Sequence, residues 1–237
     1  MNASSKKKIS TILILAAILV MPGFLYYLLQ DQGKNRYKPL PIFGPKVVAS
    51  TFHSVRGKQI PDTVYHIVDD FSLVNQSGDS ISLSTWKGKV VVLNLFYSHV
   101  NSDGAKLALK AMRGFNELYQ KNHMVHLASV SVDDQDDLKT LADVAKLWSA
   151  VPNKWDVLTG DTTTVNKLVK KSLLLDAVNQ STSIERKFIY SNKIVLLDTK
   201  HRIRGFYEAS DKEAVSKLDD EIKVLIAEEL RNIKDGR

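Results

Sequence analysis

The feature that most constrains the fold is a near-continuous apolar run, "VVVLNLF", at Val90–Phe96. A run this short and this apolar is typical of a β-strand that is buried on both faces of a sheet. Apolar residues at helical spacing then predict a helix over Ala105–Lys121. We therefore expect a buried strand that leads into an exposed loop, residues 97–104, and then into a helix.

The composition excludes whole classes of chemistry. The chain has 237 residues and no cysteine, which excludes disulfides, thiolate metal ligands and thiol nucleophiles together. Its length predicts one domain plus an appendage. The net charge of +7 is spread along the chain without a basic stripe interleaved with aromatic residues, so we expect no nucleic-acid partner.

The N-terminal segment is typical of a membrane anchor. Ile9–Leu29 carries no charge, and as a helix it would span about 31 Å, close to the thickness of one hydrocarbon core. The lysines of the preceding basic segment, residues 1–8, predict a cytoplasmic N-terminus. The alternative is a cleaved signal peptide, but no small-residue cleavage site follows. We expect a single-pass protein of the inner membrane, with its C-terminal domain in the periplasm.

The anchor is followed by a segment that is polar and rich in proline. Pro39, Pro41 and Pro45 favour an extended, semi-rigid chain, so residues 30–49 are predicted to be a periplasmic tether. The globular domain is then expected over residues 50–237.

The domain alternates between strand and helix patterns. Alternating apolar and polar residues predict a hairpin over Phe71–Leu83, with its turn at Ser77 and Gly78. Further strands are predicted over Met124–Val132, Trp155–Thr159, Lys193–Asp198 and Ile203–Tyr207, and further helices over Gln135–Ser149, Asp161–Leu175 and Asp211–Ile233. Helices between strands imply right-handed crossovers that cover both faces of a sheet. The order predicts an α/β, thioredoxin-like three-layer sandwich with a mixed central sheet and an added N-terminal hairpin.

Three stretches resemble the Sco/SenC family over roughly residues 60–230. They are "DDFSLVNQSGDSISLSTWKGKVVVLNLFYSHV", "SVSVDDQDDLKTLADVAKLWSAVPNKWDVLTGD" and "NKIVLLDTKHRIRGFYEAS". The resemblance implies a membrane-anchored thioredoxin-like protein that binds copper through a C-x-x-x-C pair and a distant histidine. It also implies a role in assembling the copper centre of cytochrome c oxidase, and for some members a role in thiol redox control.

This chain departs from the family pattern at every ligand position. His99 and Asp103 stand where the resemblance places the two cysteines, and Tyr190 stands at the position of the distant histidine. Cu(I) prefers soft sulfur ligands, and thiol–disulfide exchange requires a thiolate. We therefore expect these three residues to form a partner-facing loop. A weak Cu(II) or Zn(II) site at His99 and Asp103 remains the alternative, because nitrogen and oxygen suit those ions.

Other candidate motifs favour structural interpretations. His123 and His126 open a strand, where a spacing of three residues puts their side chains on opposite faces. The acidic run Asp133–Asp137 lacks the glycine and the distal glutamate of a calcium loop, so we expect a loop and a first helical turn there. A hydrolase triad at His99 is not indicated because the G-x-S-x-G motif is missing.

The functional expectation is an accessory factor or scaffold linked to cytochrome c oxidase assembly, without redox chemistry and without a cofactor. The expected partners are the membrane, respiratory oxidase subunits or a copper-binding paralogue. The alternatives are a metal carrier, or an envelope binding module unrelated to the oxidase. We do not expect an enzyme, since a peroxidase built on this fold would need a cysteine.

Overall fold

The computed structural model describes residues 14–16, 18–27, 39–55, 57–99, 102–182 and 187–234. The chain divides into two compact units, Met1–Pro39 and Leu40–Arg237. In the first unit, residues 14–16 and 18–27 are helical and exposed. Among the described residues, no helix combines the length and the apolar character that a membrane span requires. The anchor is predicted over residues 9–29, and its remaining residues lie outside the described ranges.

The second unit is built on a seven-stranded sheet with the order β11-β10-β5-β6-β7-β3-β4. Its strands are β3 (Leu73–Asn75), β4 (Ser80–Ile81), β5 (Val90–Phe96), β6 (Val125–Ser131), β7 (Trp155–Thr159), β10 (Lys193–Leu197) and β11 (Ile203–Glu208). The β5–β6 and β6–β7 pairs are parallel, and the remaining pairs are antiparallel. The predicted mixed sheet is therefore confirmed. The hairpin predicted over Phe71–Leu83 is confirmed as well, as the pair of β3 and β4.

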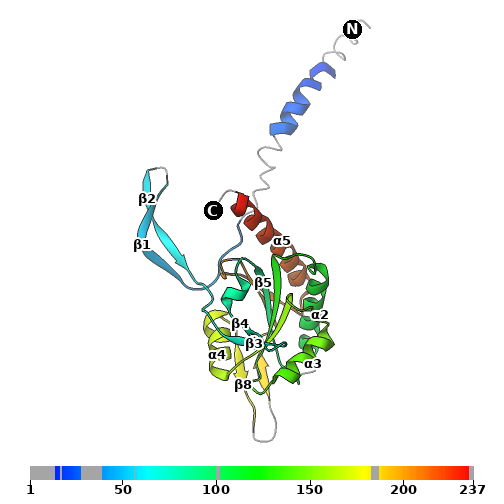
Figure 1. Cartoon of the computed structure of the whole chain (residues 1–237). Helices are drawn as coiled ribbons and strands as arrows, with labels where there is room; N and C mark the ends of the chain where they lie inside the picture. The colour runs from blue at the N-terminus through cyan, green and yellow to red at the C-terminus, as the bar shows by residue number, and fades with distance from the viewer. Residues whose placement is uncertain are drawn as a thin grey trace, which may run out of the picture. The chain divides into compact units, whose positions relative to one another are not determined.

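The helices cover both faces of this sheet, as the three-layer prediction requires (Figure 1). They are α2 (Asp103–Leu118), α3 (Leu138–Trp148), α4 (Thr162–Asn166), α5 (Lys212–Lys234) and two short helices, η1 (Leu83–Trp86) and η2 (Lys167–Ser172). Val90 and Val92 of β5 pack in one core cluster with side chains of α2 and α5. Val91, Leu93 and Leu95 face the other way, into a cluster that includes side chains of α4 and η2. This alternation is the period of two that a strand imposes.

The helix predicted over Asp161–Leu175 is shorter and ends differently. Asp161 caps α4, because its side chain accepts hydrogen bonds from the Thr163 and Thr164 N–H groups. The chain then continues as the π-helix η2, in which the Leu173 N–H donates to the Leu168 carbonyl at 2.8 Å. This wider turn lets both leucine side chains lie in the core.

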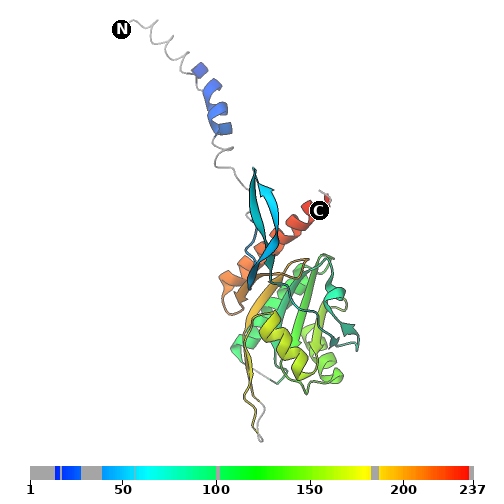
Figure 2. The same cartoon turned by 90° about the vertical axis from the view of Figure 1, so that its left-hand side faces the viewer.

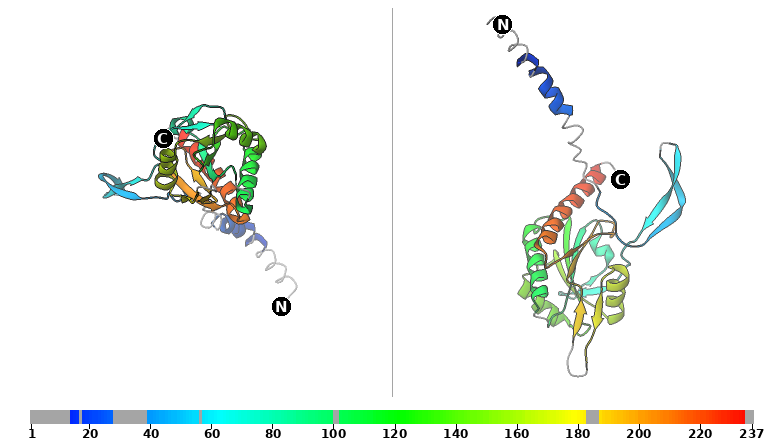
Figure 3. Two further views of the ribbon diagram at one scale, coloured as in Figure 1. Left: turned by 90° about the horizontal axis from the view of Figure 1, so that it is seen from below. Right: turned by 180° about the vertical axis from the view of Figure 1, so that it is seen from behind.

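Two hairpins were not predicted. The first joins β1 (Lys46–Val55) and β2 (Lys58–Tyr65) in a separate two-stranded sheet that stands apart from the central sheet in the views of Figures 2 and 3. The second joins β8 (Ala177–Asn179) and β9 (Phe188–Tyr190). The tether predicted over residues 30–49 therefore overlaps the compact unit, which begins at Leu40.

A buried arginine contacts the first residues of this compact unit. Arg204, only 2% exposed, donates hydrogen bonds to the Leu40 carbonyl at 2.8 Å and to the Pro41 carbonyl at 3.2 Å. Its guanidinium also forms ion pairs with Asp198 at 3.0 Å and with Glu228 at 3.3 Å. Arg204 thus connects the start of the unit to β11 and α5. The two carboxylates compensate its positive charge.

A second buried polar group, the side chain of Asp156 on β7, connects elements near the other edge of the sheet. The Asp156 carboxylate accepts hydrogen bonds from His126 Nε2 at 2.7 Å, from Trp86 Nε1 at 3.4 Å and from Asn75 Nδ2 at 3.4 Å. Burial raises the pKa of Asp156, but these hydrogen bonds outweigh it and leave the pKa below its usual value. The prediction that His126 is a structural histidine agrees with this contact.

Replacing Asp198 with asparagine is expected to lower the free energy of unfolding by about 3–5 kcal/mol, because the buried Arg204 cation loses its main partner. Urea denaturation measures the change. The control is Lys223→Ala on α5, which removes an exposed ion pair with Asp219 and is expected to have little effect. Equal effects of the two variants would contradict this account.

The stability contributed by Asp156 is expected to depend on pH. Its folded-state pKa lies below the unfolded value, so the carboxylate stabilises the fold above about pH 4 and this contribution is lost as the pH falls through the folded pKa. Asp156→Asn should therefore be clearly less stable than the natural chain at pH 5, with the gap shrinking at more acidic pH. Urea midpoints across this range measure the gap, and a gap of constant size would count against the prediction.

Candidate functional site

The parallel pairing of β5 and β6 determines where the candidate site lies. The two strands pair in register from Val90 with Val125 to Phe96 with Ser131. Because parallel strands end at the same edge of a sheet, the loops that follow β5 and β6 lie next to each other. The loop after β5 carries His99, and the loop after β6 carries Asp133 and Asp136.

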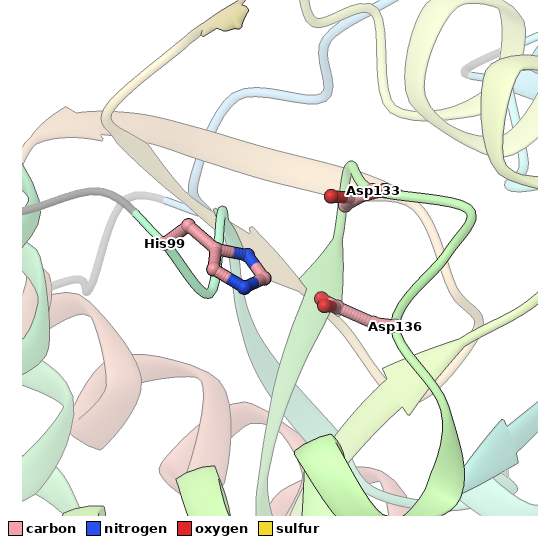
Figure 4. Close-up of side chains that lie close together, drawn as sticks. All are labelled: His99, Asp133 and Asp136. Carbon is pink, nitrogen blue, oxygen red and sulfur yellow. The ribbon is translucent and has the colours of Figure 1, made fainter. Parts of the chain in front are cut away.

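These three side chains form a compact cluster (Figure 4). One ring nitrogen of His99 and one carboxylate oxygen from each aspartate all lie within 4.8 Å of one another. Figure 4 shows the edge of the His99 ring that carries its nitrogens turned towards the two carboxyl groups. Asp133 is 2% exposed and Asp136 is 5% exposed, whereas His99 is exposed. The cluster therefore combines two buried carboxyl groups with one imidazole at the surface.

Hydrogen bonds hold both carboxyl groups in place. Asp136 Oδ1 accepts a hydrogen bond from Ser98 Oγ at 2.6 Å, and its Oδ2 accepts one from Ser131 Oγ. Ser131 Oγ in turn accepts from the Asp133 N–H at 3.1 Å. The Gln135 N–H donates to Asp133 Oδ1 at 2.9 Å. Residues from the end of β6 and from both loops thus share one hydrogen-bond network.

The same network determines the tautomer of His99. Ser98 Oγ lies 2.8 Å from His99 Nδ1, and the single hydroxyl proton of Ser98 is already donated to Asp136. His99 Nδ1 must therefore be the donor in its contact with Ser98. In the neutral ring, the lone pair is then on Nε2, where it is available to a ligand.

Asp103 does not join this cluster. It is the first residue of α2, its side chain is 96% exposed, and it forms an ion pair with Lys106 at 3.6 Å. The neighbouring Ser102 caps the helix by accepting a hydrogen bond from the Ala105 N–H. The structure thus places Asp103 in solvent at the start of the helix and groups His99 with the aspartates that follow β6.

Tyr190 lies close to the loop and is half-buried at the end of β9. Burial raises the pKa of Tyr190, with a hydrogen bond from the Tyr97 backbone acting in the opposite direction. The phenol therefore stays protonated at neutral pH and is a poor metal ligand. The Tyr97 ring also packs against the His99 ring, with a centroid distance of 5.6 Å. Tyr97 thus contacts both His99 and Tyr190.

A cavity of about 210 Å³ lies beside this region, between the end of β5 and the helices α2 and α3. Its lining includes Ser98, Lys106, Leu109, Leu147, Trp148 and Tyr190. Leu147 is 73% exposed, so part of the apolar lining faces solvent.

Asp133 and Asp136 were not predicted as site residues. The acidic run was expected to form a loop and a first helical turn, and Asp137 does cap α3 by accepting from the Thr140 N–H. The inward placement of the other two carboxyl groups depends on the parallel pairing of β5 with β6. The order of the predicted strands was the one available signal that could have placed them near His99.

Comparisons with known proteins agree on one family. A sequence model of the SCO1/SenC family matches residues 61–226. A SCO1 protein homolog of Bacillus subtilis (strain 168) is 29% identical over 105 residues, which cover 44% of this chain and 54% of that relative, about half of its length.

Two solved structures show the same fold. A SCO1/SenC family lipoprotein from Bacillus anthracis str. Ames aligns with a TM-score of 0.61 at 18% identity, over 68% of this chain and 95% of that chain. BsSco, described as a member of the Sco family of cytochrome c oxidase assembly proteins and as having a disulfide switch, aligns with a TM-score of 0.57 at 20% identity, over 68% and 93%. Because the family model matches well over half of its residues, the chain belongs to the SCO1/SenC family.

Proposed function

We propose that this chain is an accessory factor in cytochrome c oxidase assembly, and that it acts by binding partner proteins rather than by thiol chemistry or Cu(I) transfer. Membership of the SCO1/SenC family supports the link to the oxidase. The rest of the proposal depends on the loop after β5. His99 stands in this loop, and the chain contains no cysteine at any position.

The donors in this region do not fit Cu(I). That ion prefers thiolate and thioether sulfur, whereas the groups around the loop are an imidazole, carboxylates and a protonated phenol. Mutation of a residue that only hydrogen-bonds to a metal ligand typically lowers metal affinity about 10–100-fold. The absence of both sulfur ligands should therefore lower the affinity for Cu(I) by more than this. Thiol–disulfide exchange has no attacking group in this chain.

The surface around the loop has the features of a contact surface for another protein. We define the loop face as His99, Asp103, Leu107, Leu147 and Tyr190. Four of these side chains are exposed, and two of those four are apolar. His99 lies in the loop, Asp103 and Leu107 follow on α2, and Leu147 and Tyr190 line the cavity beside the loop. An apolar surface with a polar rim is typical of protein–protein contact sites.

The proposal includes a membrane anchor. Ile9–Leu29 carries no charge, and its described parts, residues 14–16 and 18–27, are helical with exposed apolar side chains. An uncharged apolar stretch of this length is more stable in the hydrocarbon core of a membrane than in water. Together with the preceding lysines, this supports a single span in the inner membrane with the domain in the periplasm.

Site-specific photocrosslinking in intact membranes tests this function. A photoreactive amino acid at Leu147 on the loop face is expected to capture an oxidase subunit or a cysteine-bearing Sco paralogue, identified by mass spectrometry. The matched control is the same amino acid at Lys87, which is exposed and precedes β5, at the opposite end of that strand. Capture from neither position, or the same products from both, would refute a specific role for the loop face.

A further inference from the structure

We infer that His99, Asp133 and Asp136 form a binding site for a divalent cation of borderline hardness, for which Zn(II) is the best match. The inference goes beyond the proposed function, because a protein can dock to a partner without binding a metal. Of the ligand positions that the family resemblance implies, the site uses only that of His99, and its other two ligands come from the loop after β6.

The charge of the buried carboxyl groups supports a cation. Asp136 is 5% exposed, and within the described part of the chain its side chain is held by the hydroxyls of Ser98 and Ser131 without a cationic partner. A carboxylate in a poorly solvated site is costly unless a positive charge compensates it. Asp133 brings a second carboxyl group into the same place. A divalent ion would compensate the charge of Asp136 and take Asp133 as a second ligand.

The donor set indicates which ion. One imidazole nitrogen and two carboxylate oxygens suit Zn(II), which binds such ligands at about 2.0–2.2 Å. Oxygen-preferring ions such as Mg²⁺ and Ca²⁺ take larger shells of oxygen ligands without imidazole, so His99 disfavours them. Three protein ligands leave the fourth tetrahedral position to water.

The hydrogen bonds around the cluster prepare the ligands. His99 donates through Nδ1 to Ser98 Oγ, so Nε2 carries the free lone pair. A metal-bound histidine commonly has its other ring N–H held by such a partner, which fixes the tautomer and the ring orientation. The second oxygen of Asp136 is held by Ser131, a buried residue of β6. The orienting contacts are therefore already formed.

The geometry requires only a small closure. One ring nitrogen of His99 and one oxygen of each carboxyl group lie within 4.8 Å of one another, and the exposed ring can turn to present Nε2. Tetrahedral zinc ligands lie about 3.3–3.6 Å apart when the bonds have their usual length. A shift of about 1–1.5 Å closes the set. His99 is exposed and can supply this shift, because the two carboxyl groups are buried and already accept hydrogen bonds.

Titration of the metal-free full chain in detergent tests the site. Calorimetry with Zn(II) is expected to show one saturable site, and Co(II) used as a spectroscopic probe should give the intense visible absorption of a four-coordinate ion. His99→Ala and Asp136→Asn should each weaken Zn(II) binding by roughly 10- to 100-fold or more. Asp103→Asn, which changes an exposed carboxylate outside the cluster, should leave the affinity unchanged.

The inference is overturned if the chain shows no saturable Zn(II) binding, or if His99→Ala binds as tightly as the natural chain. An effect of Asp103→Asn equal to that of His99→Ala would also overturn it. Circular dichroism checks that each variant is folded, and His99→Ala decides the matter if Asp136→Asn unfolds, because His99 is at the surface. Crosslinking from Leu147 does not depend on the metal, so the failure of one proposal can be told from the failure of the other.

Discussion

The in-register parallel pairing of β5 with β6 is the constraint on which the rest of the structure depends. Both strands are buried on both faces, and their pairing runs from Val90 with Val125 to Phe96 with Ser131. A shift of one residue would turn each side chain to the other face and disrupt both core clusters. Because this register cannot slip, the loops that carry His99 and Asp136 are held at one edge of the sheet.

The chain combines membership of the SCO1/SenC family with a sequence that contains no cysteine. The fold depends on apolar side chains in three layers, whereas the chemistry depends on a few residues in loops. Hydroxyls and carboxylates now form the network at the end of β5, with Ser98 and Ser131 on either side of Asp136. These groups bind harder ions than sulfur does, so the same edge of the sheet is suited to a different class of ligand.

Much of the fold could be predicted because it depends on local periodicity. The predicted bounds of the strands at Val90–Phe96 and Trp155–Thr159 match β5 and β7, since short apolar runs read directly as strands. The site could be predicted only in part, because it depends on pairing between distant segments. His99 was found from its place after β5, but its partners Asp133 and Asp136 follow a different strand. The contact of Arg204 with the backbone of Leu40 and Pro41 could not be predicted either, because these residues lie far apart in the sequence.

The most direct test of the account compares Cu(I) and Zn(II) on the same full-length protein, each in competition with a chelator of known affinity. The donors at the end of β5 are nitrogen and oxygen. We therefore expect Zn(II) to be retained at one equivalent per chain and Cu(I), under reducing conditions, to be lost entirely to the chelator. Stoichiometric retention of Cu(I), with Zn(II) lost to its chelator, would contradict it.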